Sequence, residues 1–382
     1  MNKSQRVDVS IVVPCRNEIG HIRRFLHSVS VQETPGMNVE VLVADGMSDD
    51  GTRQVLDRYV RERSDRNSDR RDDESDTSLG RCPRWLDEKL PAFFVIDNVK
   101  QTASYGLNTA IRAAQGDIII RMDVHTEYAP DYVRNCVEIL NETCADNVGG
   151  PARTRADGYM ARAIALGFHS RFACGGARFR DPRYEGYVDT VPYGCWRKST
   201  LEGLGLFDET LVRSQDDELN VRIAASGGKI WQSPKITSWY RPRTNLSSLF
   251  RQYFQYGFWK VSVIRKHRKP PSWRNLIPGA SLFAAIALLF AAAIAMLIGL
   301  MHLRNEFLCD WAALSSLYFA ASISASFLSA RKHGWKFLPI LPVVFATYHL
   351  SYGLGSLLGF SYHPPAWIHP TFVQKALTVI TR

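Results

Sequence analysis

Residues 7–14 read Val-Asp-Val-Ser-Ile-Val-Val-Pro and predict a buried β-strand. The stretch is short, rich in β-branched residues and stopped by a proline. Three similar runs follow at residues 39–44, 93–96 and 117–122, and helical patterns lie between them. This alternation predicts an α/β fold with a doubly wound, mostly parallel sheet, in which ligands bind at the carboxyl ends of the strands.

Charge is unevenly distributed along the 382 residues. Almost all of it lies before about Arg274, and the rest of the chain is mostly apolar. The long apolar runs cover residues 276–300, 311–330 and 337–360. Each has the length of about 20 residues that a helix needs to cross a bilayer core. We therefore expect a basic juxtamembrane segment at 261–275 and three transmembrane helices within 276–360.

A buried core helix is the alternative interpretation of these runs. It is weakest for the first run, which is apolar all round, and strongest for the third. The third run carries the polar side chains of Tyr348, His349, Ser351 and Tyr352. It also contains Gly-Ser-Leu-Leu-Gly at 355–359, a small-xxx-small pattern suited to close helix packing.

The net charge of +10 needs an explanation. No nucleic-acid recognition motif accompanies it, and basic residues crowd before the first apolar run and again at 331–336. Cytoplasmic loops carry such positive charge, so we expect a multi-pass protein of the cell (inner or plasma) membrane. The N-terminal region would be cytoplasmic and the tail, residues 361–382, would lie outside. The seven scattered cysteines also favour a reducing compartment.

Residues 61–90 interrupt the alternation of strands and helices. The first part of this segment is almost entirely Arg, Asp, Glu, Ser and Asn, with nearly balanced charge and no apolar periodicity. Such a composition predicts a largely disordered insertion.

Polar residues follow the predicted strands. Asp45 ends the second strand, and its carboxylate can accept a hydrogen bond from a nucleobase N–H while Gly46 lets the backbone turn. The alternative is an Asp-Gly turn in which Asp49 or Asp50 caps the next helix.

Asp123 and His125 stand two residues apart after the fourth strand. In extended backbone such residues share a face. Mixed oxygen and nitrogen ligands suit Mn²⁺ or Mg²⁺, with phosphate oxygens completing the shell. The alternative is a surface histidine beside an aspartate that caps a turn.

Residues 215–219, Gln-Asp-Asp-Glu-Leu, open a predicted helix. Acidic residues are ordinary at a helix N-terminus because they complement the helix dipole. In a cleft, one of them could instead be a general base for a hydroxyl group.

Together these stretches resemble the family 2 glycosyltransferases, which have the GT-A fold. The resemblance covers roughly residues 9–260, so we expect a glycosyltransferase domain over residues 1–260. The matching motifs lie at 12–18, 44–48, 123–125 and 215–222. The resemblance implies an inverting reaction with Asp216 as the catalytic base, and Asp123 and His125 as ligands of a divalent metal. The nucleotide-sugar site that it implies comprises Pro14, Arg16, Glu18, Asp45 and Asp123, with Asp45 on uracil.

Residues 121–128, residues 188–194 and the three-span tail resemble the succinoglycan-biosynthesis glucosyltransferases. That resemblance implies UDP-glucose as donor and a lipid-linked (polyprenyl diphosphate) sugar acceptor in exopolysaccharide biosynthesis. The chain departs from the wider family at Gln215, where Glu is usual, and at Arg16, where many members place an aromatic residue under the base. A guanidinium plane can stack there too.

Other functions remain open at this stage. A processive polysaccharide synthase is disfavoured because Phe258 replaces the arginine of the Gln-x-x-Arg-Trp motif; a polyprenyl-phosphate glycosyltransferase is a further alternative. A sugar nucleotidyltransferase would need a glycine-rich loop where residues 14–18 stand. An inactive membrane-bound scaffold would not need the acidic motifs.

Residues 249–263 predict an interfacial helix. The candidate sugar platforms are Tyr193, Trp196 and Trp239, with core packing expected for at least one of them.

Overall fold

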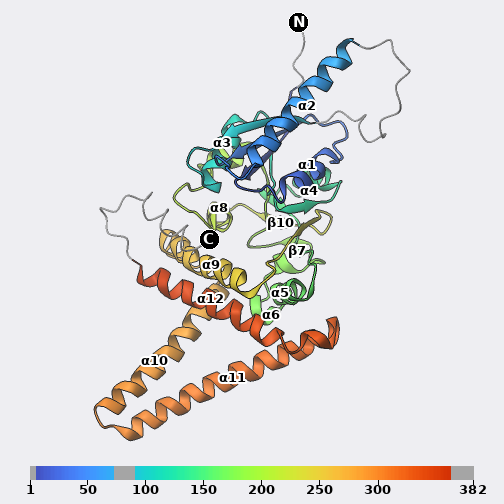
Figure 1. Cartoon of the computed structure of the whole chain (residues 1–382). Helices are drawn as coiled ribbons and strands as arrows, with labels where there is room; N and C mark the ends of the chain where they lie inside the picture. The colour runs from blue at the N-terminus through green and yellow to red at the C-terminus, as the bar shows by residue number, and fades with distance from the viewer. Residues whose placement is uncertain (1–5, 73–90, 363–382) are drawn as a thin grey trace. The chain divides into compact units, whose positions relative to one another are not determined.

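The computed structural model describes residues 6–72 and 91–362, and the chain forms two compact units (Figure 1). Unit 1 comprises Met1–Arg153, Asp181–Thr210 and Gln215–Arg241, and unit 2 comprises Thr154–Arg180, Leu211–Ser214 and Pro242–Arg382. The domain predicted at residues 1–260 therefore includes all of unit 1 and part of unit 2.

An eight-stranded sheet runs through unit 1 in the order β3-β2-β1-β4-β9-β6-β10-β8. Its strands are β1 (Val9–Cys15), β2 (Val39–Asp45), β3 (Ala92–Asp97), β4 (Ile118–Arg121), β6 (Asn147–Gly149), β8 (Gly186–Tyr187), β9 (Cys195–Arg197) and β10 (Ile230–Gln232). The first four strands are the predicted ones, and they pair in parallel. Strand β9 lies antiparallel between β4 and β6, so the sheet is mixed beyond β4. A small second sheet joins β5 (Thr126–Tyr128), β11 (Ser238–Tyr240) and β7 (Arg153–Thr154).

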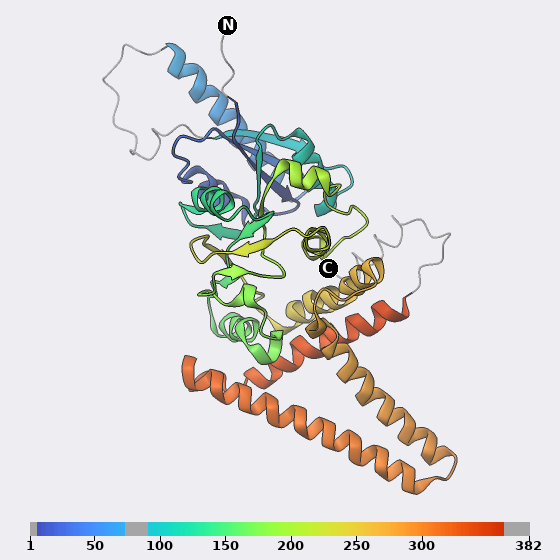
Figure 2. The same cartoon turned by 180° about the vertical axis from the view of Figure 1, so that it is seen from behind.

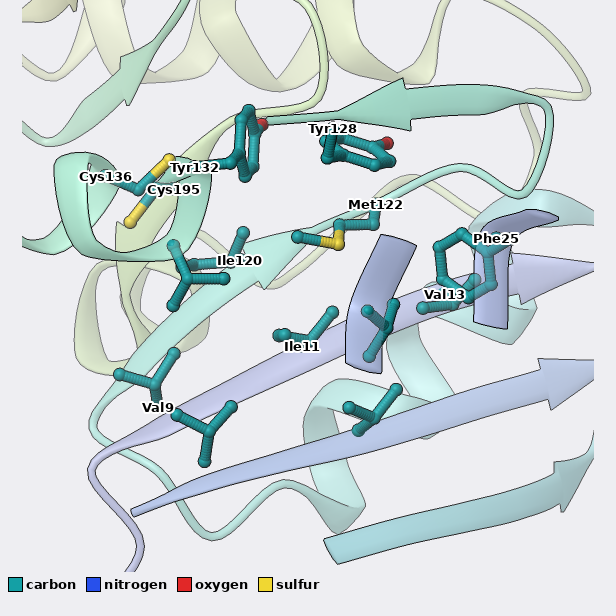
Figure 3. Packing of buried hydrophobic residues seen from close by; sticks show 14 of the residues in the cluster. Val9, Ile11, Val13, Phe25, Ile120, Met122, Tyr128, Tyr132, Cys136 and Cys195 are labelled. Atoms are coloured by element: carbon teal, nitrogen blue, oxygen red, sulfur yellow. The ribbon is translucent and has the colours of Figure 1, made fainter. Parts of the chain in front are cut away.

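Helices cover both faces of the large sheet. They are α1 (Ile22–Ser30), α2 (Thr52–Asp72), α3 (Ala103–Ala113), α4 (Tyr132–Thr143), α7 (Lys198–Gly203) and α8 (Gln215–Ala225). Because side chains alternate along a strand, Val9, Ile11 and Val13 of β1 pack on one face, together with Phe25 of α1 (Figure 3). Val12 points to the opposite face, where α3 and α8 contribute to a second core. The predicted doubly wound arrangement is confirmed.

Helix α2 differs from the prediction for residues 61–90. It continues to Asp72, so the expected disorder is wrong for residues 61–72; residues 73–90 lie outside the described residues. A helix that is polar all round shows no apolar periodicity, and pairs four residues apart support it, as Arg53 and Asp57 do at 3.1 Å. Composition alone therefore could not distinguish this helix from a disordered segment.

Unit 2 is helical. Its helices are α5 (Tyr159–His169), α6 (Arg171–Cys174), α9 (Leu246–His267), α10 (Ile277–Leu297), α11 (Met301–His333) and α12 (Leu341–Ser361), with short 3-10 turns η2 (Arg178–Arg180), η3 (Trp273–Asn275) and η4 (Trp335–Phe337). Three stretches of the described chain are long and apolar enough to cross a membrane: Trp273–Leu297, Met301–His333 and Leu341–Ser361. They match the three predicted runs. Helices α10 and α11 are joined by residues 298–300 alone, so Glu306 lies in the first turns of α11.

Candidate active site

The carboxyl ends of β1, β2 and β3 bring three residues into line. Cys15 pairs with Asp45, and Asp45 pairs with Asp97. Asp45 is 1% exposed and accepts hydrogen bonds from the hydroxyl of Ser48 at 2.5 Å and from its backbone N–H at 3.3 Å. Arg53 donates to Asp97 at 2.6 Å and reaches Asp45 at 3.4 Å. The Asp45 carboxylate is thus fixed and partly neutralised at the sheet edge, as a base-binding acceptor would have to be.

The loops after β1 and β2 are tied together. Asn17, which has a left-handed φ of 54°, donates its backbone N–H to Ser48 and its side-chain amide to Asp49, both at 2.9 Å. The backbone N–H of Glu18 donates to Thr52 at 2.8 Å. These bonds hold the segment of residues 14–18 against the turn that follows Asp45. The predicted site residues Pro14, Arg16 and Glu18 therefore lie with Asp45 at the same edge of the large sheet.

Arg16 packs on the Asp45 turn. A Cβ atom at Gly46 would lie 3.1 Å from the Arg16 side chain, so the glycine makes room for it. The buried Nε of Arg16 has no hydrogen-bond partner. Buried donors are rarely left unpaired, and one at this edge suits a polar ligand.

Arg121, at the end of β4, is the electrostatic centre of the site. Its Nε donates to Asp123 Oδ1 at 2.9 Å and its Nη2 donates to Asp123 Oδ2 at 3.1 Å. Its Nη1 donates to Asp216 Oδ1, which comes from the first turn of α8. One buried guanidinium, 4% exposed, therefore holds two predicted site residues that are far apart in the chain.

Neighbouring charges change the pKa of Arg121 and of Asp216. Burial disfavours the charged guanidinium, but Asp123 and Asp216 outweigh burial and raise the pKa of Arg121. Burial also raises the pKa of Asp216; Arg121 opposes this rise, and the charges of Asp123 and Asp217 add to it. The net effect is a carboxyl group with a pKa above its ordinary value, which is the direction that makes a carboxylate a better base.

A second acid of α8 is structural. Glu218 is fully buried and pairs with Arg222 at 2.7 Å. Arg222 also donates to the carbonyl oxygens of Leu204 and Leu206 at 2.5 and 2.7 Å. Of the three acids that open α8, Glu218 therefore anchors the helix, and Asp216 faces Arg121.

His125 lies beside Glu18, with its Nδ1 3.6 Å from a carboxylate oxygen, and its ring meets the Tyr240 ring edge to face. Among the residues that the structure describes, no group of three or more His, Cys, Asp or Glu could hold a metal. Asp123 and His125 still supply one oxygen and one nitrogen donor. That set fits a cation whose remaining ligands come from a bound diphosphate, because Mg²⁺-type ions are commonly held by one or two protein ligands and substrate phosphates.

The three candidate sugar platforms separate. Trp196 is 2% exposed and packs against Phe207 in the core, which confirms the core packing expected for at least one of the three. Tyr193 shares a hydrogen bond of 2.6 Å with Thr126, and burial raises the pKa of its hydroxyl. Trp239 is half-buried in β11 and remains a candidate.

The sequence interpretation missed Arg121 and Arg53 as site residues. A charged residue inside the apolar strand Ile-Ile-Ile-Arg, two positions before an aspartate, was the available signal for Arg121, since such charges are buried only with partners. Arg53 carried no comparable signal, because an arginine in the first turns of a polar helix is ordinary.

The mixed sheet, the strand-end carboxylates and the acidic start of α8 agree with the glycosyltransferase expected from the sequence motifs. The model of the family described as Glycosyl transferase family 2 matches residues 10–71 and 71–197. Together with a relative 30% identical over most of its length, this shows that the chain belongs to family 2 and is a glycosyltransferase.

That relative is the succinoglycan biosynthesis protein ExoA of Rhizobium meliloti, aligned over 70% of this chain and 73% of its own. A dolichyl N-acetyl-α-D-glucosaminyl phosphate 3-β-D-2,3-diacetamido-2,3-dideoxy-β-D-glucuronosyltransferase of Methanococcus voltae is 26% identical, over 74% of this chain and 81% of its own. Among solved structures, the mannosyltransferase PcManGT of Pyrobaculum calidifontis, in complex with GDP-Man and Mn²⁺, has a TM-score of 0.53 at 20% identity. It covers 93% of this chain and 88% of its own, and it shows the fold.

Proposed function

We propose that the protein is an inverting hexosyltransferase that moves glucose from UDP-glucose to a lipid-linked (polyprenyl diphosphate) oligosaccharide in exopolysaccharide biosynthesis. The names of the two relatives support this class of pathway: one acts in succinoglycan biosynthesis, and the other acts on a sugar carried by dolichyl phosphate. The apolar helices of unit 2 support an acceptor that resides in a membrane.

The donor would bind at the strand ends. Asp45 accepts a hydrogen bond from the base N–H, and the unpartnered Nε of Arg16 faces the same edge. The diphosphate lies near Asp123 and His125, which would hold a divalent cation, Mn²⁺ or Mg²⁺. That cation, when bound, neutralises the charge that develops on the leaving diphosphate.

Asp216 removes the proton from the acceptor hydroxyl. The resulting oxygen forms a bond to the anomeric carbon from the face opposite the diphosphate. The bond from that carbon to the diphosphate oxygen breaks, and its electron pair leaves with UDP. The observation that supports this assignment is that Arg121 bonds both Asp216, the proposed base, and Asp123, the carboxylate proposed to lie at the diphosphate.

Unit 1 would lie at the inner or plasma membrane on its cytoplasmic side, because nucleotide sugars are made in the cytoplasm. The basic residues that precede α10, among them Arg265 and Lys266, support that side.

The test is transfer of radiolabel from UDP-glucose into the lipid extract of membranes that contain the protein and Mn²⁺. Asp216→Asn should lower transfer about 10²- to 10⁴-fold, the usual contribution of a general base. Asp217→Asn is the matched control, because it removes a neighbouring acid of the same helix turn, and it should keep most of the transfer.

Equal labelling by the wild type and Asp216→Asn would remove Asp216 as the base while leaving the reaction class intact. No labelling by the wild type would show that the donor or the acceptor is wrong, and other nucleotide sugars would then be tested.

A further inference from the structure

Helices α9 and α12 lie side by side and run in the same direction (Figures 1 and 2). Tyr253 packs on Tyr348, with ring centroids 4.3 Å apart. About three turns later, Arg265 donates to the carbonyl oxygens of Phe360 and Tyr362 at 2.6 and 2.7 Å. The contacts advance together along both helices, so the pair is parallel.

Glycines bring the two backbones into contact. A Cβ atom at Gly257 of α9 would lie 2.1 Å from the carbonyl oxygen of Tyr352, and one at Gly355 of α12 would lie 2.1 Å from that of Phe254. Backbone atoms cannot move aside as a flexible side chain can. The two helices therefore form a close-packed pair, and both must have the same position relative to the membrane.

Helix α9 is unsuited to cross a membrane. It carries Arg251 and Lys260 within its length and Arg265 and Lys266 in its last turn, and it is not among the candidate spans of the described chain. Charges at such positions are costly in the bilayer core.

Chain direction excludes the remaining arrangements. If α10, α11 and α12 all crossed, α12 would leave the side of unit 1, and its parallel partner α9 would have to cross with it. Four consecutive crossings, however, would make α9 and α12 antiparallel. A surface position of both helices, with α10 and α11 as a hairpin, agrees with the parallel contacts and with the charges of α9.

Contacts of the first half of α12 agree with this position. The Tyr348 hydroxyl donates to the carbonyl oxygen of Ile164 in α5 at 2.9 Å, and His349 Nε2 lies 3.0 Å from that of Phe172 in α6. Helices α5 and α6 belong to Thr154–Arg180, which leaves unit 1 and returns to it without any candidate span among the described residues. Were α12 to cross the bilayer, Tyr348 would lie about 10 Å along it and draw α5 in with it.

One face of α12 is apolar and uncovered. Its members, spaced seven, four and four residues apart, are Val343, Leu350, Leu354 and Leu358, and they are 47%, 47%, 40% and 48% exposed. The face adjoins the first turn of α10, where a Cβ at Gly353 would lie 2.8 Å from the carbonyl oxygen of Pro278. An apolar stripe beside a membrane helix, with basic residues at the end of α9, fits the boundary between lipid headgroups and acyl chains.

We propose that only α10 and α11 cross the membrane, and that α9 and α12 lie together on its surface, on the side of unit 1, with the apolar face of α12 in the lipid. Ser361 then lies on the same side as unit 1, in contrast to the orientation expected from counting positive charges over three spans. The proposal concerns topology and does not depend on the donor or the acceptor.

A membrane-impermeant maleimide tests it in intact cells, with peptide mass spectrometry assigning each labelled cysteine. The full chain carries His302→Cys, beside the α10–α11 turn, or Ser361→Cys, at the end of α12; the native, exposed Cys144 of unit 1 is the internal reference. We expect the reagent to label His302→Cys under conditions in which Cys144 stays unlabelled, because the two residues would lie on opposite sides of the membrane. Ser361→Cys should be labelled only under conditions in which Cys144 is labelled as well. Labelling of Ser361→Cys together with His302→Cys would overturn the proposal, and so would labelling of His302→Cys only together with Cys144.

Reporters fused after Arg382 give an independent readout if Ser361→Cys reacts on neither side. A green fluorescent protein fusion should fluoresce and an alkaline phosphatase fusion should be inactive when unit 1 is cytoplasmic. The reverse pair of results contradicts a surface position for α12.

Discussion

Arg121 decides the chemistry available at this site. Two carboxylates close to each other without a cation would repel each other, and one would take up a proton. The guanidinium is fully charged at any working pH and forms fixed, directional bonds to both acids. It therefore opposes the rise in the pKa of Asp216 that burial causes. The same arginine sets the position of the proposed base relative to the proposed diphosphate site.

Removing this cation should shift the pH dependence of transfer. The proposed general-base catalysis needs the ionised form of Asp216, so activity should fall as the pH drops through the pKa of Asp216. Because that pKa is raised, the acid limb should lie above the ordinary aspartate value of about 3.9. In Arg121→Met the opposing cation is gone, and the limb should move to higher pH by about one unit or more.

The measurement is the pH profile of kcat/KM for the wild type, Arg121→Met and Arg121→Lys. The lysine variant keeps the charge but not the fork, so its limb should lie between the other two. Arg53→Met is the control, because Arg53 serves Asp45 and Asp97 and should leave the limb in place. Three superimposable acid limbs would show that Arg121 does not tune the base.

At the scale of elements, α8 is held by the Glu218 and Arg222 pair. Glu218 is fully buried, and Arg222 connects it to the chain that follows α7. Asp216 stands two residues before this anchor. A helix fixed so close to the base leaves little freedom in the direction of its carboxylate.

Arg222→Met should destabilise the protein by about 3–5 kcal/mol, because it leaves Glu218 buried without its partner. The double variant Glu218→Leu with Arg222→Met should recover part of this loss, since both charges are then absent. Thermal unfolding in detergent, followed by intrinsic fluorescence, measures both. If Arg222→Met has the same melting temperature as the wild type, the Glu218 and Arg222 pair does not anchor α8.

The elements that sequence could predict are those that bury a long apolar pattern. Strands β1 to β4 and helices α1 and α3 were predicted because apolar periodicity dominates in each. Strands β6, β9 and β10 have three residues each, too few for a period to show, so the part of the sheet beyond β4 was not predicted. Helix α2 was missed beyond residue 61 because its sequence there has no apolar periodicity.

The site followed the same logic. Strand-end acids such as Asp45 and Asp123 were found because the sheet topology brings them to one edge. The contact between Arg121 and Asp216 depends on how α8 returns to β4 from 95 residues away. No local pattern encodes that return, and only the folded chain shows it.

At the scale of the whole molecule, the residues of the proposed nucleotide site all lie in unit 1 and the candidate spans lie in unit 2. A ligand of unit 1 should therefore stabilise the protein without any membrane lipid. The proposed lipid-linked acceptor, in contrast, would come to a protein held at the bilayer by the apolar helices of unit 2. Donor binding and membrane attachment can be measured separately for this reason.

UDP with Mn²⁺ should raise the melting temperature of the detergent-solubilised protein. A ligand at 100 times its Kd stabilises the folded state by about 2.7 kcal/mol. Asp45→Asn should reduce this shift with or without the cation, because it weakens the contact to the base. His125→Ala should remove only the part of the shift that a chelator removes. Asp216→Asn should keep the full shift, since the proposed base would contact the acceptor rather than UDP. If the wild type shows no shift at saturating UDP and Mn²⁺, the protein does not bind this donor class, and a scaffold role becomes the better explanation of its acidic motifs.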